Sequence, residues 1–334
     1  MQLFTLGLTQ LNMDGSAVVD ANNNPVPTYD QTTVTNMAKV VTGWTYPTAP
    51  GATAKKNNPA YYYGQMFAVE SEHDKTAKTI FGNTTIPAGQ TAEADLEALL
   101  DALMAQPTMA PFISEQLIQH LVTSNPSPAY IQRISQVFEN DGSGVRGNLQ
   151  AVITAILTDA EARAGDGAQS AITVNFGHLR EPILMMANLL RGLNATVATP
   201  NGVSNDASNL SEELFYAPSV FSYFSPQYRT EHGLLGPEFQ IYSTQTAASR
   251  DDTVNTLLYG TVAGVKLNLA PFVALAGNTT NLLTYIGEVF LHSSMSAALQ
   301  NAMTDAVNAQ TTAAAKADAA LYVALTSSEY QVIQ

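Results

Sequence analysis

Apolar residues that recur with a helical period are the sequence feature that most constrains this fold. Leu96, Leu99, Leu100, Leu103 and Met104 follow the pattern i, i+3, i+4, i+7, i+8, which places them on one face of a helix. Helices are expected on similar grounds in further segments: 32–43, 113–121, 128–138, 149–163, 183–193, 282–291, 295–309 and 311–325. The pattern argues against a parallel sheet. It predicts a mainly α protein, a multi-helix orthogonal bundle with long irregular loops and at most a small β-hairpin.

One stretch, Leu214–Gln240, breaks the helical pattern and is named the aromatic stretch. It follows an expected loop at 196–209, and it precedes an expected short helix at 253–259. Its three prolines remove backbone donors and fix φ, so a regular element is excluded. Its many Phe and Tyr rings are too apolar to lie in water, because each packed ring hides much apolar surface. We therefore expect an irregular segment laid into the body of the fold, with helices packed around it.

The length and the apolar content of the chain allow a large core. The chain has 334 residues, of which 46% are hydrophobic, and this is ample for one large domain. Residues 165–177 are small, polar and rich in glycine, which makes them the best candidate for a boundary. The prediction is a single helical domain over residues 1–334, and the alternative is two packed halves, 1–165 and 178–334.

The charge of the chain limits its partners. With 28 acidic residues against 14 basic residues, the net charge is −14, so cations would be attracted. No nucleic-acid partner is expected, since phosphate contacts need Lys and Arg. No run of about 18 apolar residues occurs, so no membrane insertion is predicted. The N-terminus lacks the basic region and cleavage site of a signal peptide. Cysteine is absent, which removes disulfides and Cys-ligated metal sites.

The densest group of ionisable residues lies at 70–74. His73 is the candidate general base, since a nearby carboxylate can orient an imidazole or share a metal ion with it. Asp74 is either the orienting acid of His73 or a metal ligand, and Glu70 and Glu72 are further metal ligands. The implied cofactor is a divalent cation, Ca²⁺ or Zn²⁺, and otherwise there is none. The alternative interpretation is a solvated, turn-forming polar segment.

A second group of candidates lies in and after the aromatic stretch: Arg229, Glu231, His232, Glu238 and Arg250. Arg229 or His232 would stabilise negative charge that develops in a reaction. Glu231 and His232 lie in a glycine-flanked loop beside the aromatic residues, which is typical of a pocket rim and equally of a surface turn. The chain has no G-x-S-x-G elbow, H-E-x-x-H zinc helix, P-loop or dinucleotide-binding glycine motif. Any catalysis must therefore use groups that are brought together from distant positions.

Several phrases of the sequence are similar to one bacterial family. They are VVTGWTY at 40–46, HDKTAKTIFG at 73–82, GVRGNLQAVITAILTDAEAR at 144–163, LREPIL at 179–184, APSVFSYFSP at 217–226, GLLGPEFQI at 233–241 and ALYVALTSSEYQV at 320–332. Together they resemble the family DUF1800, which has no settled activity. The resemblance implies a helical fold and export to the periplasm or the outside of a bacterium. Members typically carry an export signal, more helices and an Arg-Glu pair before the part that this chain resembles, so a site that needs that pair would be incomplete.

Two functions from different classes remain open. The first is a hydrolase of small ester, lactone or glycosidic substrates, in which a metal or a carboxylate–His73 pair activates water. The second is a non-catalytic exported envelope protein that binds a partner or a polymer through exposed rings of the aromatic stretch. Full burial of Phe221, Tyr223 and Phe224 would remove this second function. The clustered acids favour the hydrolase, whose partner is a small-molecule substrate.

Overall fold

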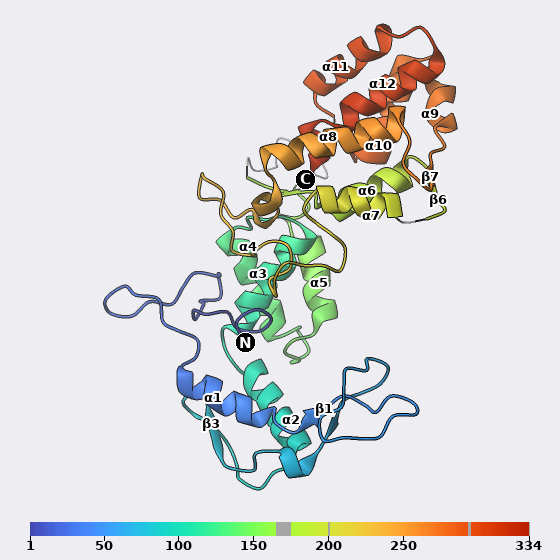
Figure 1. The fold of residues 1–334 in the computed structure, drawn as a ribbon. Coiled ribbons are helices and arrows are strands. Elements are labelled where there is room, and N and C mark those ends of the chain that lie inside the picture. The colour runs from blue at the N-terminus through green and yellow to red at the C-terminus, as the bar shows by residue number, and fades with distance from the viewer. Residues whose placement is uncertain (165–174, 200, 293–294, 334) are drawn as a thin grey trace. The chain divides into compact units, whose positions relative to one another are not determined.

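The computed structural model describes residues 1–164, 175–199, 201–292 and 295–333, and helices dominate them (Figure 1). Contacts divide the chain into two compact units. Unit 1 comprises Met1–Leu117 and Ser127–Ile156, and unit 2 comprises Ile118–Pro126 and Leu157–Gln334. Most of the boundary expected at 165–177 lies outside the described residues, because 165–174 are not described.

Unit 1 combines helices, short strand pairs and a long irregular N-terminal segment. β1 pairs with β2 and β3 pairs with β4, both antiparallel. Isolated antiparallel bridges, such as that between Thr9 and Pro27, fold residues 1–30 back on themselves. The elements are α1 (Gln31–Val40), β1 (Trp44–Thr45), β2 (Phe67–Ala68), the 3₁₀ helix η1 (Glu70–Glu72), β3 (Lys78–Ile80), β4 (Thr84–Ile86), α2 (Ala92–Met104), α3 (Met109–Leu121), α4 (Pro128–Glu139) and α5 (Leu149–Thr158).

Side-chain caps explain where two helices of unit 1 begin. Thr91 accepts a hydrogen bond from the backbone N–H of Ala94 at the start of α2. Ser127 accepts one from Tyr130 at the start of α4, where Pro128 occupies the first turn. The buried residues of these helices include members of the predicted apolar stripes: Leu99, Leu103, Ile131, Ile134 and Phe138.

Unit 2 consists mainly of helices, with two small strand pairs. β5 pairs with β8 and β6 pairs with β7, again antiparallel. The elements are β5 (His178–Leu179), α6 (Pro182–Gly192), β6 (Thr196–Val197), α7 (Asn201–Asn209), the 3₁₀ helix η3 (Pro237–Ile241), α8 (Thr244–Tyr259), β7 (Val265–Lys266), α9 (Ala270–Leu275), α10 (Thr279–Phe290), α11 (Ala297–Asn308), α12 (Ala313–Leu325), α13 (Ser328–Gln331) and β8 (Val332–Ile333).

Two helices of unit 2 differ from those predicted from the sequence. α7 occupies much of the segment 196–209, where a loop was expected, and α8 begins at Thr244 instead of residue 253. Both segments are rich in polar residues, so apolar periodicity gives no signal there. α8 begins where Ser243 and Thr246 form a reciprocal capping box. The two helices contact each other in unit 2.

The core of unit 2 forms between α6 and the helices from α8 to α13. Its buried side chains include Leu189, Phe272, Phe290, Leu321 and Tyr330. The alanine-rich helix α12 contacts α8, α9, α10 and α11, and its small side chains allow this close packing (Figure 1). A mainly α fold is therefore confirmed, with four two-stranded sheets in the described part of the chain. Every described helix is too short or too polar to span a bilayer.

Gly192, the last residue of α6, leaves no space for a side chain. A Cβ at this position would lie 2.3 Å from Cε1 of Phe290. We expect Gly192→Ala to lower the free energy of unfolding by about 1–3 kcal/mol, because Phe290 must leave its packed position. Urea denaturation followed by far-UV circular dichroism measures the loss. Gly277→Ala is the matched control, since its Cβ meets nothing within 4 Å. Equal stability of the two variants would contradict the packing described for α6.

Candidate functional site

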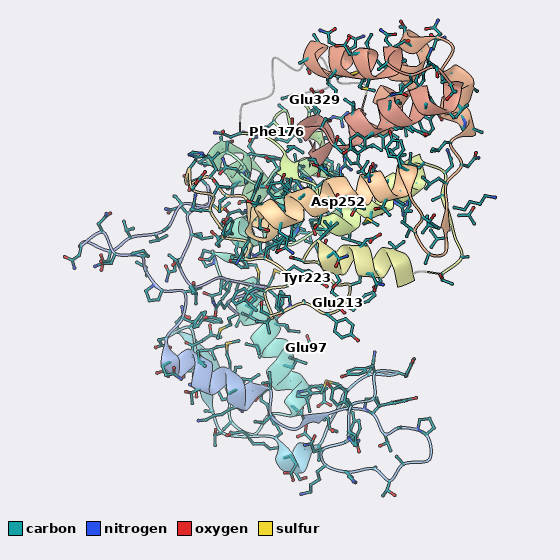
Figure 2. All side chains as sticks on the ribbon, turned by 45° about the horizontal axis from the view of Figure 1, so that its top comes forward. Glu97, Phe176, Glu213, Tyr223, Asp252 and Glu329 are labelled. Atoms are coloured by element: carbon teal, nitrogen blue, oxygen red, sulfur yellow. The ribbon has the colours of Figure 1, made fainter. Side chains whose placement is uncertain are left out.

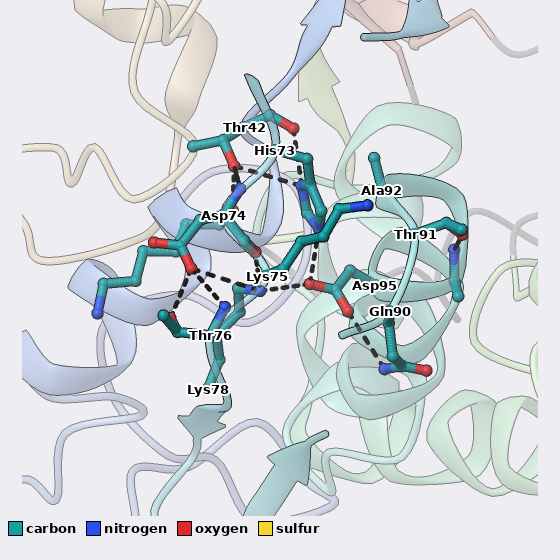
Figure 3. Close-up of polar contacts among 12 residues, drawn as sticks. Thr42, His73, Asp74, Lys75, Thr76, Lys78, Gln90, Thr91, Ala92 and Asp95 are labelled. Carbon is teal, nitrogen blue, oxygen red and sulfur yellow. Dashed lines mark hydrogen bonds and ion pairs between the residues drawn. The ribbon is translucent and has the colours of Figure 1, made fainter. Parts of the chain in front are cut away.

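His73 lies in a buried cluster of ionisable side chains in unit 1, formed with Lys78 and Asp95 (Figure 3). The Nε2 atom of His73 is 3.1 Å from Oδ2 of Asp95, and Nζ of Lys78 is 2.6 Å from the same oxygen. Oδ1 of Asp95 accepts a hydrogen bond from Gln90 at 3.2 Å. The side chains of His73 and Asp95 are fully buried, and that of Lys78 is nearly so. We name these three residues the buried triad.

The backbone around Gly43 brings His73 to its place. Gly43 has φ +83°, and a Cβ there would lie 3.1 Å from the backbone N of His73. Glycine tolerates this conformation and this close approach. The turn puts Thr42 beside the imidazole, where Nδ1 of His73 is 3.1 Å from the carbonyl oxygen of Thr42. Both ring nitrogens of His73 therefore have partners inside the protein.

Asp74 does not take the orienting role expected for it. Its carboxylate accepts hydrogen bonds from Thr76, including one of 2.8 Å from the backbone N–H. The hydrogen bonds from Thr76 hold the pKa of Asp74 below its usual value. Asp95, 22 positions after His73, occupies the place next to the imidazole instead.

The predicted metal ligands each have a different protein partner. Glu70 pairs with Lys75 at 2.7 Å and accepts a 2.9 Å hydrogen bond from the backbone N–H of Ala92, at the start of α2. Glu72 pairs with Lys56. The hydrogen bonds from Lys75 and from Lys56 lower the pKa of Glu70 and that of Glu72 respectively. In the described residues, no group of three or more His, Asp or Glu side chains is placed to hold a metal ion.

Arg229 and His232 belong to unit 2, whereas residues 70–74 belong to unit 1. The Nη1 atom of Arg229 donates a 2.7 Å hydrogen bond to the carbonyl of Gly233 and so closes its own turn. His232 is exposed, and its Nε2 atom is 3.7 Å from Oε1 of the exposed Glu231. These contacts are those of a surface turn, which was one of the two interpretations of this loop.

Glu238 is buried in unit 2 beside two residues that the sequence did not single out. Oγ of Ser124 donates a 2.8 Å hydrogen bond to Oε2 of Glu238, and Nδ1 of His178 is 3.8 Å from Oε1. Burial raises the pKa of Glu238 to about 7, and burial lowers the pKa of His178 to about 4. The two groups therefore resist ionisation in the folded state.

Further buried charges hold the C-terminal segment of unit 2. Nη1 of Arg250 donates a 2.8 Å hydrogen bond to Oε1 of Gln331, and Nε of Arg180 donates one of 3.2 Å to the carbonyl of Tyr330. The guanidinium of Arg180 also lies 4.7 Å from the centre of the Tyr330 ring. Glu212 accepts a 2.8 Å hydrogen bond from a backbone N–H at the start of α6, and burial raises its pKa to about 7.

The sequence marks Glu238 and Arg250 as candidates, and phrases shared with the family contain two members of this group. LREPIL contains Arg180, and GLLGPEFQI contains Glu238. The shared phrases do not contain Ser124, His178 or Glu212, and the residues around these three do not mark them as candidates. All six side chains are buried, and their contacts stabilise the fold of unit 2.

The first part of the aromatic stretch lies at the surface, contrary to the expectation of burial. Phe215 is 98% exposed, Tyr216 73%, Val220 71% and Phe221 40%. We name residues 215–221 the aromatic loop. Later parts of the stretch are buried, among them Phe224 and Leu235. The prediction failed for the loop because composition measures how apolar a segment is and not where it lies. Phe221 and Tyr223 are not fully buried, so the condition that would remove a binding function is not met.

Hydrogen bonds fix the base and the tip of the aromatic loop. The hydroxyl of Tyr223 donates to the carbonyl of Glu213, and Figure 2 shows these two residues next to each other. The backbone N–H of Ser222 donates to the carbonyl of Ser219 at 3.1 Å. Oγ of Ser219 accepts a 3.1 Å hydrogen bond from the backbone N–H of Phe221. The loop is therefore an ordered turn with its rings facing solvent.

Comparison with protein families agrees with the resemblance of the phrases. The model of the family described as "Protein of unknown function (DUF1800)" matches residues 1–332, essentially the whole chain. The chain therefore belongs to the DUF1800 family. Neither a curated protein nor a solved structure matches it. The family description names no activity.

Proposed function

We propose that the chain is a non-catalytic binding protein that docks a protein partner through the aromatic loop. The observation that supports this is the exposure of Phe215, Tyr216, Val220 and Phe221 within seven consecutive residues. Large apolar side chains that lie together in water mark interaction sites, and aromatic anchors supply much of the binding energy of an interface.

The geometry of the loop supports the same proposal. Phe215 has φ +65°, a left-handed conformation that costs a residue with a Cβ about 1–3 kcal/mol. Such a conformation persists where the surroundings fix it, and here the bond between Tyr223 and Glu213 closes the loop. A loop that is ordered before binding loses less conformational entropy when a partner docks.

The side chains of the loop fit a protein better than a polysaccharide. Phe215, Val220 and Phe221 have no polar group to bond sugar hydroxyls, and an apolar groove would cover them fully. The net charge of −14 favours a basic rim around such a groove. If the chain is exported, as the family resemblance implies, the partner is a component of the cell envelope.

The hydrolase expected from residues 70–74 receives less support. A general base must lie within hydrogen-bond reach of the proton that it removes from a substrate or water. The His73 side chain is fully buried, and Thr42 and Asp95 already bond both of its nitrogens. Asp74 and Thr76 bond each other, and Glu70 and Glu72 pair with lysines. These contacts favour a structural role for the segment.

Photocrosslinking tests the proposed function. A benzophenone amino acid at Val220 should give one discrete adduct with a second protein in the bacterial host, and Phe215→Ser with Phe221→Ser should abolish it. Val145 is the matched control, since it is also an exposed valine, in unit 1. No discrete adduct at Val220, the same adduct from Val145, or an adduct with a second copy of the chain would contradict the proposal.

A further inference from the structure

α7 and α8 form a polar pocket in unit 2, and no residue of the aromatic loop is among those that line it. The pocket has a volume of about 450 Å³. α7 and the turn after it contribute Asp206, Asn209 and Ser211, and α8 contributes Gln245, Asp252 and Thr256, among others. Asp252 lies midway along α8 (Figure 2). The volume is in the range of pockets that hold small molecules.

Three polar side chains of this pocket are not used to hold the fold, whereas Thr253 donates a hydrogen bond to the carbonyl of Ser249 within α8. The side chains of Asp206, Asn209 and Asp252 make no hydrogen bond or ion pair with another residue in the described part of the chain. Burial raises the pKa of Asp206 above its usual value, and no neighbouring charge offsets this. Asp206 is half-buried, and Asn209 and Asp252 are exposed to solvent. Free carboxyl and amide groups around one hollow are therefore available to a ligand.

The lining selects the chemistry of that ligand. It consists of hydroxyl, amide and carboxyl side chains, and no Lys, Arg, aliphatic or aromatic side chain of the described residues lines it. Two carboxylates disfavour an anion, and an apolar ligand would find nothing to pack against. Hydroxyl groups both donate and accept, so they can donate to Asp206 and Asp252 while they accept from Asn209 and Gln245.

An aromatic ring extends the same face of α8. Gln245, Asp252 and Thr256 recur at helical spacing, and Tyr259 follows Thr256 one turn further along. Tyr259 is about half exposed, and its ring packs against Tyr322 with 6.0 Å between centroids. Tyr259 therefore presents an apolar ring face and a polar hydroxyl. The ring face suits the C–H groups of a sugar, and the hydroxyl suits the hydroxyls of the sugar.

We propose that the pocket between α7 and α8 binds a neutral polyhydroxylated ligand, such as a sugar unit of a neutral oligosaccharide. Asp206 and Asp252 accept hydrogen bonds from its hydroxyls, Asn209 and Gln245 donate to them, and Tyr259 stacks on an adjoining unit. This site is separate from the aromatic loop, and it does not depend on the proposed partner.

Saturation-transfer NMR on the full chain tests the site with maltotriose, cellotriose and chitotriose. We expect transfer to at least one of the three, and we expect Asp252→Ala to weaken that binding about tenfold or more, because a hydrogen bond to a charged group is lost. Asp251→Ala is the matched control: Asp251 is the neighbouring aspartate of α8 and does not line the pocket. Far-UV circular dichroism checks that both variants are folded.

Three results would overturn the proposal. No transfer to any of the three trisaccharides is the first, and equal weakening by Asp251→Ala is the second. The third is binding of Ca²⁺ or spermidine that Asp252→Ala abolishes while no trisaccharide binds, since that would make the pocket a cation site. The Val220 crosslink should be unchanged in Asp252→Ala, so failure of this site and failure of the proposed function can be distinguished.

Discussion

Replacing Asp95 with alanine is expected to lower the free energy of unfolding by about 3–5 kcal/mol. Oδ2 of Asp95 is the common acceptor for Nζ of Lys78 and Nε2 of His73, and all three side chains are shielded from water. The variant removes the closest carboxylate of the buried Lys78 ammonium and leaves it the carbonyl of Asp74 and the Asp74 carboxylate at 3.9 Å. Loss of one partner of a buried ion pair costs far more than the net contribution of the pair, because the remaining charge is desolvated and unpaired.

The single tryptophan makes this loss measurable in the unit that contains it. Trp44 is the only Trp of the chain and lies in β1 of unit 1, so urea denaturation followed by its fluorescence reports this unit. Lys75→Ala is the control, because Lys75 and its partner Glu70 are partly exposed and such a pair contributes about 0–1 kcal/mol. If Asp95→Ala cost no more than Lys75→Ala, the buried triad would not stabilise unit 1.

The stability of the chain is expected to fall as the pH rises from about 5 to about 6.5. The ordinary pKa of Glu is 4.5, and burial raises the pKa of Glu212 and of Glu238 to about 7. Each therefore adds stability that is complete below pH 4.5 and is lost as the pH rises through 7. His178 acts in the opposite direction: its pKa falls from 6.5 to about 4, so its contribution is complete above pH 6.5 and is lost as the pH falls. Between about pH 5 and about pH 6.5 the folded state holds two carboxyl protons that the unfolded state has lost, and it lacks one imidazole proton that the unfolded state holds. The net difference is about one proton, so the free energy of unfolding falls by about 1.4 kcal/mol per pH unit.

Glu238→Gln should remove one of the two carboxyl contributions. Relative to the natural chain, the variant should gain about 3 kcal/mol between pH 5 and pH 8, because the amide has no proton to lose in its buried site. Thermal or urea unfolding of the full chain at several pH values, followed by circular dichroism, measures this change. Glu231→Gln alters an exposed glutamate and serves as the control. Parallel stability curves for the natural chain and Glu238→Gln would show that Glu238 is not held protonated.

Apolar periodicity predicted the helices that bury a stripe of side chains. The expected segments 183–193 and 311–325 correspond closely to α6 and α12, whereas α5 ends at Thr158 and not near residue 163 as expected. Polar helices carry no such stripe, and this is why α7 and the first half of α8 were missed. The pocket between these two helices could not be predicted from the sequence for the same reason.

Some partners of the candidate residues could not be predicted, because they lie far away in sequence and only the fold brings them together. His73 and Asp74 are adjacent in sequence, yet the acid that bonds the His73 imidazole is Asp95, on helix α2. An acid in the first turn of a helix is favoured by the helix dipole whatever its other partners are, so its position there does not identify His73 as a partner. Likewise, Phe215 and Phe224 have the same side chain, and only the turn between them decides that one is exposed and the other buried.

The dissociation constant of the protein that crosslinks at Val220 tests the central claim most directly. It should be measured by calorimetry for the natural chain and for the double variant that combines Phe215→Ser with Phe221→Ser. An unchanged far-UV circular dichroism spectrum shows that the double variant is folded. Loss of anchor rings typically costs at least about 2 kcal/mol, so we predict that the affinity falls about 30-fold or more. An unchanged dissociation constant in the folded variant would contradict a binding function of the aromatic loop.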